Sequence, residues 1–180
     1  MKESLLFTKE WMKNPLQAGA LFQTSNTFAK RICSAVDYSN GYILELGAGL
    51  GNITAHLAPK IDPAKFACVE IEQRFYTHLK QKFPNLHIIK GSAENLETLL
   101  PEMVGKVRCI VSLIPMVSLK PALRQKILQS CLNMLDEKGF ILQGSYYWKP
   151  ITTHLQAKIE HIDFIWKNMP PIHIYKYTKI

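Results

Sequence analysis

The fold is decided by the stretch YILELGAGLGNITAHLA, residues 42–58. Its first five residues form a mostly apolar run that predicts a buried strand, and residues 52–58 are predicted to be helical. Gly47, Gly49 and Gly51 lie between the two. Glycine at a strand-to-helix turn lets a ligand approach the backbone with no Cβ in the way, and free N–H groups at a helix start favour a carboxylate. The stretch therefore predicts a site for a nucleoside-type ligand.

The spacing of these glycines argues against a dinucleotide. The pyrophosphate-binding fingerprint places its third glycine one residue after Gly51, where this chain has Asn52. Glu45 precedes the loop and offers a carboxylate to an α-ammonium group, while the loop itself suits an α-carboxylate. An amino-acid-bearing nucleoside needs both interactions. We therefore predict S-adenosylmethionine, with S-adenosylhomocysteine as the product, held by Glu45, Gly47, Ala48, Gly49 and Gly51.

An acidic residue further along the chain supports the same ligand. Glu70 ends an apolar run 19 residues after the last glycine, and a carboxylate there can hold both ribose hydroxyls through its two oxygens. Glu72 is the rival, because it shares a face with Glu70 if the strand extends that far. We prefer Glu70, with Ile71 beside the cofactor. Ser92 and Ala93 follow the next apolar run and are predicted to contact adenine, unless Ser92 caps a helix.

Outward from this stretch, short apolar runs alternate with helical segments, which predicts an α/β fold with a mostly parallel sheet. The last two predicted strands are separated by the five residues KNMPP, 167–171, a connection that suits an antiparallel pair. We expect a Rossmann-like, seven-stranded sheet that ends in an antiparallel pair and carries helices on both faces. The predicted strands include residues 42–46, 65–70, 86–89, 107–112, 140–145, 161–166 and 172–177. The predicted helices are residues 26–36, 52–58, 73–82 and 121–135, with a turn at 136–139.

Residues 1–40 precede the first core strand and are predicted to be a helical segment that shares one domain with the catalytic part, residues 41–180. The apolar residues near the start of the chain do not form a clean helical stripe. Two interpretations stay open: a membrane-surface helix, and a helix packed on the core or over the active site. Gln23 and Thr24 are expected to close over the methionine end of the cofactor, and Thr24 or Ser25 to cap the next helix.

The ends of the fourth and fifth predicted strands should face the methyl acceptor, because open parallel sheets bind ligands beyond the carboxyl ends of their strands. Ser112 ends the fourth strand, beside the cofactor, and its hydroxyl or the carbonyl of Ile114 is predicted to accept hydrogens from an amine. Tyr146 is predicted to orient that amine. With Tyr147 and Trp148 it forms an aromatic group that suits cation–π attraction to an ammonium, packing in the core, or a membrane interface.

The composition fits one globular domain of 180 residues, 47% apolar and 20% charged. Lys and Arg outnumber Asp and Glu by 22 to 14. The net charge of +8 favours nucleic acid or anionic lipid as a partner, or serves solubility alone. The chain has no run of about 18 apolar residues and no recognisable signal peptide. Cys33, Cys68, Cys109 and Cys131 lack zinc-ligand spacing, which predicts no metal site and reduced, buried thiols in a cytoplasmic protein.

The chain resembles the bacterial phospholipid N-methyltransferase family, which methylates phosphatidylethanolamine toward phosphatidylcholine. The likeness rests on the glycine loop and on three more particular segments: an Asn-Pro…Gly-Ala start at residues 14–20, Ser-x-x-Pro at 112–115 and Asn-x-Pro-Pro at 168–171. Two positions depart from the family pattern, because Leu113 stands where glycine is usual and Ser92 where aspartate is usual. More distantly, the chain is similar to the ribosomal RNA adenine dimethylases.

The resemblance implies an S-adenosylmethionine-dependent N-methyltransferase that acts on phosphatidylethanolamine-type lipids, at the cytoplasmic surface of the inner leaflet. We expect a phospholipid membrane as a peripheral partner and no obligate protein partner, and we rank nucleic acid lower. Two alternatives stay open: a methyltransferase acting on RNA adenine or a small soluble amine, and a cofactor-binding protein without turnover. The chain lacks the Asn/Asp-Pro-Pro-Tyr segment typical of nucleobase N-methyltransferases, which weakens the RNA alternative.

Overall fold

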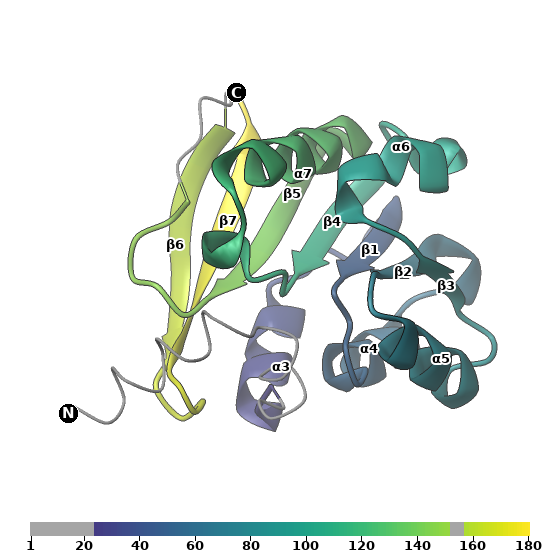
Figure 1. The fold of residues 1–180 in the computed structure, drawn as a ribbon, viewed down its shortest axis with the longest axis horizontal. Helices are drawn as coiled ribbons and strands as arrows, with labels where there is room; N and C mark the ends of the chain where they lie inside the picture. Colours follow the sequence, from purple (N-terminus) through teal and green to yellow (C-terminus); the bar gives the residue numbers. More distant parts are fainter. Residues whose placement is uncertain (1–23, 152–156) are drawn as a thin grey trace.

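A computed structural model describes residues 24–151 and 157–180. Its strands form one seven-stranded sheet in the order β3-β2-β1-β4-β5-β7-β6 (Figure 1). Strands β1 to β5 are parallel, and β7 is antiparallel to both of its neighbours. This confirms the predicted α/β class and its antiparallel end. The strands are β1 (Tyr42–Leu46), β2 (Phe66–Glu70), β3 (His87–Lys90), β4 (Val107–Ser112), β5 (Leu135–Ser145), β6 (Ala157–Ile165) and β7 (Ile172–Lys179).

Helices cover both faces of this sheet (Figure 1). One face carries α3 (Asn26–Ser34), α4 (Asn52–Leu57) and α5 (Gln73–Lys82), and the other carries α6 (Leu96–Leu99) and α7 (Pro121–Met134). The inner strands are apolar on both sides because each face is covered, and in β2 all five residues are buried. Short 3-10 helices lie at Ala58–Lys60, Pro63–Lys65, Ala93–Asn95, Pro101–Met103 and Met116–Ser118.

Helix α3 begins where the sequence predicts it. Ser25 caps the helix, because its hydroxyl oxygen accepts a hydrogen bond from the Phe28 N–H at 3.1 Å. Phe28 and Ile32 are four residues apart, so they share one helix face, and both are fully buried against the sheet. Burial of the Phe28 side chain contributes about 1.5–3 kcal/mol. The helix is therefore firmly attached to the strands that carry the site.

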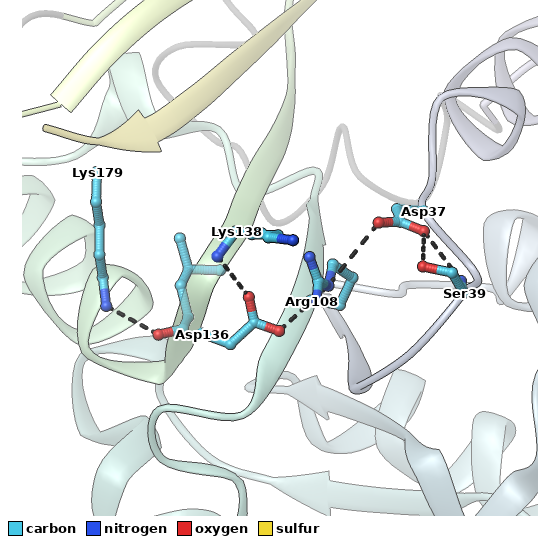
Figure 2. Close-up of polar contacts among 7 residues, drawn as sticks. Asp37, Ser39, Arg108, Asp136, Lys138 and Lys179 are labelled. Atoms are coloured by element: carbon cyan, nitrogen blue, oxygen red, sulfur yellow. Dashed lines mark hydrogen bonds and ion pairs between the residues drawn. The ribbon is translucent and has the colours of Figure 1, made fainter.

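The predicted turn at residues 136–139 is wrong, since these residues belong to β5, with a register shift against β4. Asp136 does make a turn-like contact, because its carboxylate accepts from the Lys138 N–H at 2.9 Å. The same carboxylate also pairs with Arg108 at 3.2 Å, and Arg108 reaches Asp37 at 3.8 Å (Figure 2). The Arg108–Asp136 pair joins β4 to β5 near their amino ends, and the Arg108–Asp37 pair joins β4 to the segment between α3 and β1.

Several further expectations can be compared with the described residues. Cys33, Cys68, Cys109 and Cys131 are buried and free, as predicted. Within residues 24–151 and 157–180, no three His, Cys, Asp or Glu side chains are placed to hold a metal ion. In the same part of the chain, no helix has the length and apolar character needed to cross a bilayer. The helix expected near the start of the chain, and the cofactor contact of Gln23, lie outside the described residues.

Candidate active site

The loop between β1 and α4 folds as expected, but its glycines serve different purposes. Gly47, Gly49 and Gly51 have φ values of 70°, 55° and 76°, in the region where glycine carries the least strain. A side chain at Gly49 would meet nothing within 4 Å, whereas one at Gly51 would strike the Phe83 ring at 2.6 Å. The N–H groups of all three glycines already donate to oxygens of the protein. The loop therefore offers a ligand open space at Gly49, and not these three N–H donors.

A cavity of about 380 Å³ opens at the carboxyl edge of the sheet, within the size range of small-ligand sites. Its walls come from the glycine loop, from the ends of β2, β4 and β5, and from residues at the start of β7 and in α7. Among the described residues that line it, the charged ones are Glu70 and Glu72, and both are acidic. A mostly apolar cavity with negative charge at one end suits a positively charged ligand better than a phosphate ester.

Glu70 is the acid that the sequence favours, and the protein fixes both of its oxygens. It ends β2, lines the cavity and is 4% exposed. One carboxylate oxygen accepts from the Gly49 N–H at 3.0 Å, and the other accepts from the Glu72 N–H at 2.9 Å. Each oxygen retains capacity for another hydrogen bond, so the group is held ready for a ligand diol. Glu72 also lines the cavity, but its carboxylate lies 3.7 Å from Arg74.

Glu45 lies beneath the loop, away from the cavity. It is 2% exposed, it is not among the lining residues, and its carboxylate accepts from the Thr54 hydroxyl at 2.8 Å. Burial raises the pKa of Glu45 to about 7, although hydrogen bonds from Thr54 and Cys68 oppose this change. Side chains alternate along β1, so Glu45 shares the face of Ile43, which α4 covers. In this structure Glu45 therefore ties β1 to α4, through the hydrogen bond from Thr54 to its Oε2. The predicted contact of Glu45 with an α-ammonium stays a prediction.

The predicted adenine end is made by Ile71, Ser92 and Ala93, which all line the cavity. Ile71 is apolar and 65% exposed, so it presents a surface that a flat, apolar ligand would cover. The Ser92 hydroxyl donates to the Glu94 carboxylate at 3.2 Å and does not cap the 3-10 helix that follows. The structure thus disfavours the capping alternative, while the adenine contact itself stays a prediction.

At the acceptor end, the protein uses the predicted polar groups for its own bonding. Ser112 is 3% exposed, does not line the cavity, and its hydroxyl oxygen accepts from the Ile114 N–H at 3.3 Å. The Ile114 carbonyl accepts from the Met116 N–H at 2.7 Å and from the Gln143 amide at 3.0 Å. Both lone pairs of that oxygen are then engaged. Ile114 therefore forms part of the wall, while Ser112 lies behind it and supports the backbone of Ile114. The predicted contacts of both residues with an amine stay predictions.

Tyr146 lies at the cavity wall, and Asn168 holds it there. Burial raises the pKa of the Tyr146 phenol, and a hydrogen bond with the Asn168 side chain opposes this change. Asn168 is 3% exposed; its Oδ1 accepts from the Ser25 N–H at 2.9 Å and its Nδ2 donates to the Pro170 carbonyl at 2.8 Å. One side chain thus joins Tyr146, the start of α3 and the β6–β7 turn. Asn168 belongs to the Asn-x-Pro-Pro segment, but the sequence alone indicates no role for its side chain.

Thr24 also lies at the wall, and its closure over the methionine end of the cofactor stays a prediction. The Asn52 side-chain amide donates to the Thr24 carbonyl at 3.0 Å. Asn52 is the residue that replaces the third glycine of the dinucleotide fingerprint. Its side chain therefore links the end of the glycine loop to the chain before α3, at the wall of the cavity.

The glycine loop after β1, the buried acid at the end of β2 and the antiparallel final pair define an S-adenosylmethionine-dependent methyltransferase with a Rossmann-like sheet. Comparison with known proteins agrees. Residues 43–139, more than half of the 180, match the family described as "Methyltransferase domain". The chain belongs to this methyltransferase family.

Individual relatives and structures resemble the chain to different extents. A ribosomal RNA small subunit methyltransferase A from Ureaplasma urealyticum is 33% identical over 124 residues, which cover 63% of this chain and 43% of that protein. An ornithine lipid N-methyltransferase from Singulisphaera acidiphila is 21% identical over 183 residues, covering 97% of this chain and 95% of that protein. The structure of a TehB-like SAM-dependent methyltransferase from Corynebacterium glutamicum has a TM-score of 0.64 at 17% identity, with 99% of each chain covered. The chain thus spans less than half of the first relative and nearly all of the second.

The donor groups of the cavity fit S-adenosylmethionine. The Glu70 carboxylate would hold the ribose hydroxyls, Ile71 and Ala93 would flank the adenine, and the open space at Gly49 would admit the methionine portion. The acidic character of the charged lining residues suits a sulfonium cation. When bound, the cofactor supplies an electrophilic methyl group.

Proposed function

We propose that the methyl acceptor is the amine of a membrane lipid headgroup, with phosphatidylethanolamine as the representative. The observation that carries this proposal is the apolar acceptor end of the cavity, where none of the described lining residues is Lys, Arg or His. Apolar surroundings disfavour an ammonium relative to the free amine, and the free amine is the attacking form. A soluble phosphoamine or a nucleotide would bring its phosphate to a wall whose described residues include no cation, whereas a lipid keeps its phosphate at the bilayer surface.

The relatives lend this proposal separate support. The ornithine lipid N-methyltransferase aligns along nearly the whole chain, although at 21% identity. The segments that resemble the phospholipid N-methyltransferases include Asn-x-Pro-Pro, whose Asn168 holds Tyr146 at the cavity. Leu113, which departs from that family's pattern, lies over Gly144, where an added Cβ would be 2.5 Å from the leucine side chain. The departure therefore adds apolar surface to the acceptor end.

The residues of the chain would act by positioning. Direct transfer needs the amine nitrogen and the methyl carbon held in line at close range, and no covalent intermediate on the protein. Tyr146 would orient the amine through its hydroxyl, since an ordinary tyrosine phenol is neutral at physiological pH and burial moves its pKa further up. Leu113 and Pro115, which line the cavity, would exclude water from the reacting atoms.

The test measures transfer of radiolabelled methyl groups from S-adenosylmethionine to four acceptors: phosphatidylethanolamine vesicles, ornithine lipid vesicles, phosphoethanolamine and ribosomal RNA. We expect organic-phase label with one or both lipids, and loss of that label in Glu70→Gln but not in the matched control Glu72→Gln. Label confined to RNA or phosphoethanolamine would refute the lipid acceptor. Tight S-adenosylhomocysteine binding without label in any arm would favour a binding protein without turnover.

A further inference from the structure

Three large apolar side chains stand exposed beyond β5 and β6. Trp148, Trp166 and Met169 are 73%, 69% and 82% exposed. Tryptophan is seldom left so exposed in a globular domain, and its apolar ring with a polar N–H suits the boundary between membrane and water. For Trp148, this exposure favours the membrane-interface interpretation of the aromatic group over packing in the core.

Strand pairing brings these residues to the edge where the cavity opens. Ser145 of β5 pairs with His173 of β7, and Ile165 of β6 pairs with Ile172 (Figure 1). The segments that follow β5 and β6 thus leave the sheet within two strand spacings of each other, about 10 Å. Tyr146 and Ile172, which border these segments, both line the cavity. The exposed residues therefore lie beside the cavity mouth.

A lysine follows each of the two tryptophans. The Lys149 ammonium lies 4.9 Å from the centroid of the Trp148 ring, and the Lys167 ammonium lies 5.5 Å from that of Trp166. Neither 146–151 nor 165–172 contains Asp or Glu. The surface is therefore apolar and cationic, which suits an anionic bilayer: the rings enter the headgroup region, and the lysines reach its phosphates.

The backbone under these side chains is held from inside the protein. Asn168 lies between Trp166 and Met169 in sequence, yet it is buried and hydrogen-bonded to the start of α3 and within its own turn. The Tyr175 hydroxyl donates to the Trp148 carbonyl at 2.5 Å. A backbone held in this way presents the exposed side chains in a fixed arrangement, which lowers the entropic cost of docking.

We propose that Trp148, Lys149, Trp166, Lys167 and Met169, here called the tryptophan rim, dock the protein on an anionic lipid bilayer with the cavity mouth toward the headgroups. The orientation rests on the proposed function, since it brings a lipid amine to the cavity without extracting the lipid. Binding of the rim to vesicles requires no turnover, so it can be tested separately.

The test is cosedimentation of the full chain with vesicles of phosphatidylcholine and phosphatidylglycerol, compared with phosphatidylcholine alone, without methyl donor. Trp148→Ala with Trp166→Ala is expected to lower the partition coefficient at least about tenfold. Replacing the two lysines of the rim by glutamine is expected to lower it about fivefold for each, on the anionic vesicles only. The matched control is Val104→Ala, because Val104 is also apolar and 40% exposed but precedes β4, at the opposite edge of the sheet.

The depth to which the rim enters the bilayer is measured by quenching of tryptophan fluorescence with brominated lipids. The experiment uses a Trp11→Phe variant, in which Trp148 and Trp166 are the remaining tryptophans. We expect both to be quenched. Unquenched emission would refute the docking role of the tryptophan rim. Unchanged vesicle binding by the double alanine variant, in protein that still binds S-adenosylhomocysteine, would refute it as well. The docking role would also be refuted if the double alanine variant lost binding to RNA but kept its binding to vesicles. A rim that binds vesicles while no lipid is methylated refutes the proposed function and leaves the docking surface standing.

Discussion

Replacing Glu70 by glutamine is the sharpest test of the cofactor site. The carboxylate accepts two backbone hydrogen bonds, from Gly49 at 3.0 Å and from Glu72 at 2.9 Å, and has one further acceptor position on each oxygen for a ribose hydroxyl. Glutamine keeps one oxygen and turns an NH₂ group toward a backbone N–H. A hydrogen bond to a charged group contributes about 1.5–3 kcal/mol. Losing one such bond to ribose therefore weakens binding about 10- to 150-fold.

Isothermal titration of S-adenosylhomocysteine into the wild type, Glu70→Gln and Glu72→Gln measures this change directly. We expect the Glu72 variant to stay within about threefold of the wild type, because its carboxylate faces Arg74 at the start of α5. Glu70→Ala should weaken binding further and lower the melting temperature, since it leaves two backbone N–H groups without their acceptor. Wild-type affinity in Glu70→Gln together with a large loss in Glu72→Gln would refute the assignment and restore the rival acid.

Three further predictions concern the rest of the site. Because burial raises the pKa of Glu45 from 4.5 to about 7, the folded state binds its proton more tightly than the unfolded state does. The free energy of unfolding should therefore fall by about 3 kcal/mol between these two pH values and level off above. Urea titrations across this pH range should show no such decline in the free energy of unfolding of Glu45→Gln. A decline in the variant equal to that of the wild type would contradict the prediction. Asn168→Ala should lower kcat more than it raises KM, and a double-mutant cycle with Tyr146→Phe should show the two effects to be non-additive by at least about 0.5 kcal/mol, whereas additivity would mean that Asn168 acts elsewhere. Gly49→Ala should weaken S-adenosylhomocysteine binding at a modest cost in stability. Gly51→Ala should mainly lower the melting temperature, because its Cβ would strike Phe83 at 2.6 Å. The opposite pattern in melting and titration experiments would refute the roles given to these glycines.

Much of the fold was predictable because it depends on neighbours along the chain. The strand–loop–helix pattern at residues 42–58, the Ser25 cap of α3 and the short connection before β7 each follow from local rules. Residues 136–139 show where such rules fail. They have the composition of a turn, but in the structure they belong to β5, where Asp136 also contacts Arg108 of β4.

The sequence by itself determined the ligand class, through the glycine spacing, Asn52 in place of a third fingerprint glycine, and Glu70 at the end of its strand. Only the tertiary structure decided which polar groups face the cavity and which ones bond within the protein. Glu45 accepts from Thr54, the Ile114 carbonyl accepts from Gln143, and Asn168 joins segments 143 residues apart through its bond to Ser25. The physical reason is that a hydrogen-bond donor or acceptor has a fixed capacity, and partners distant in sequence use that capacity only when the chain folds.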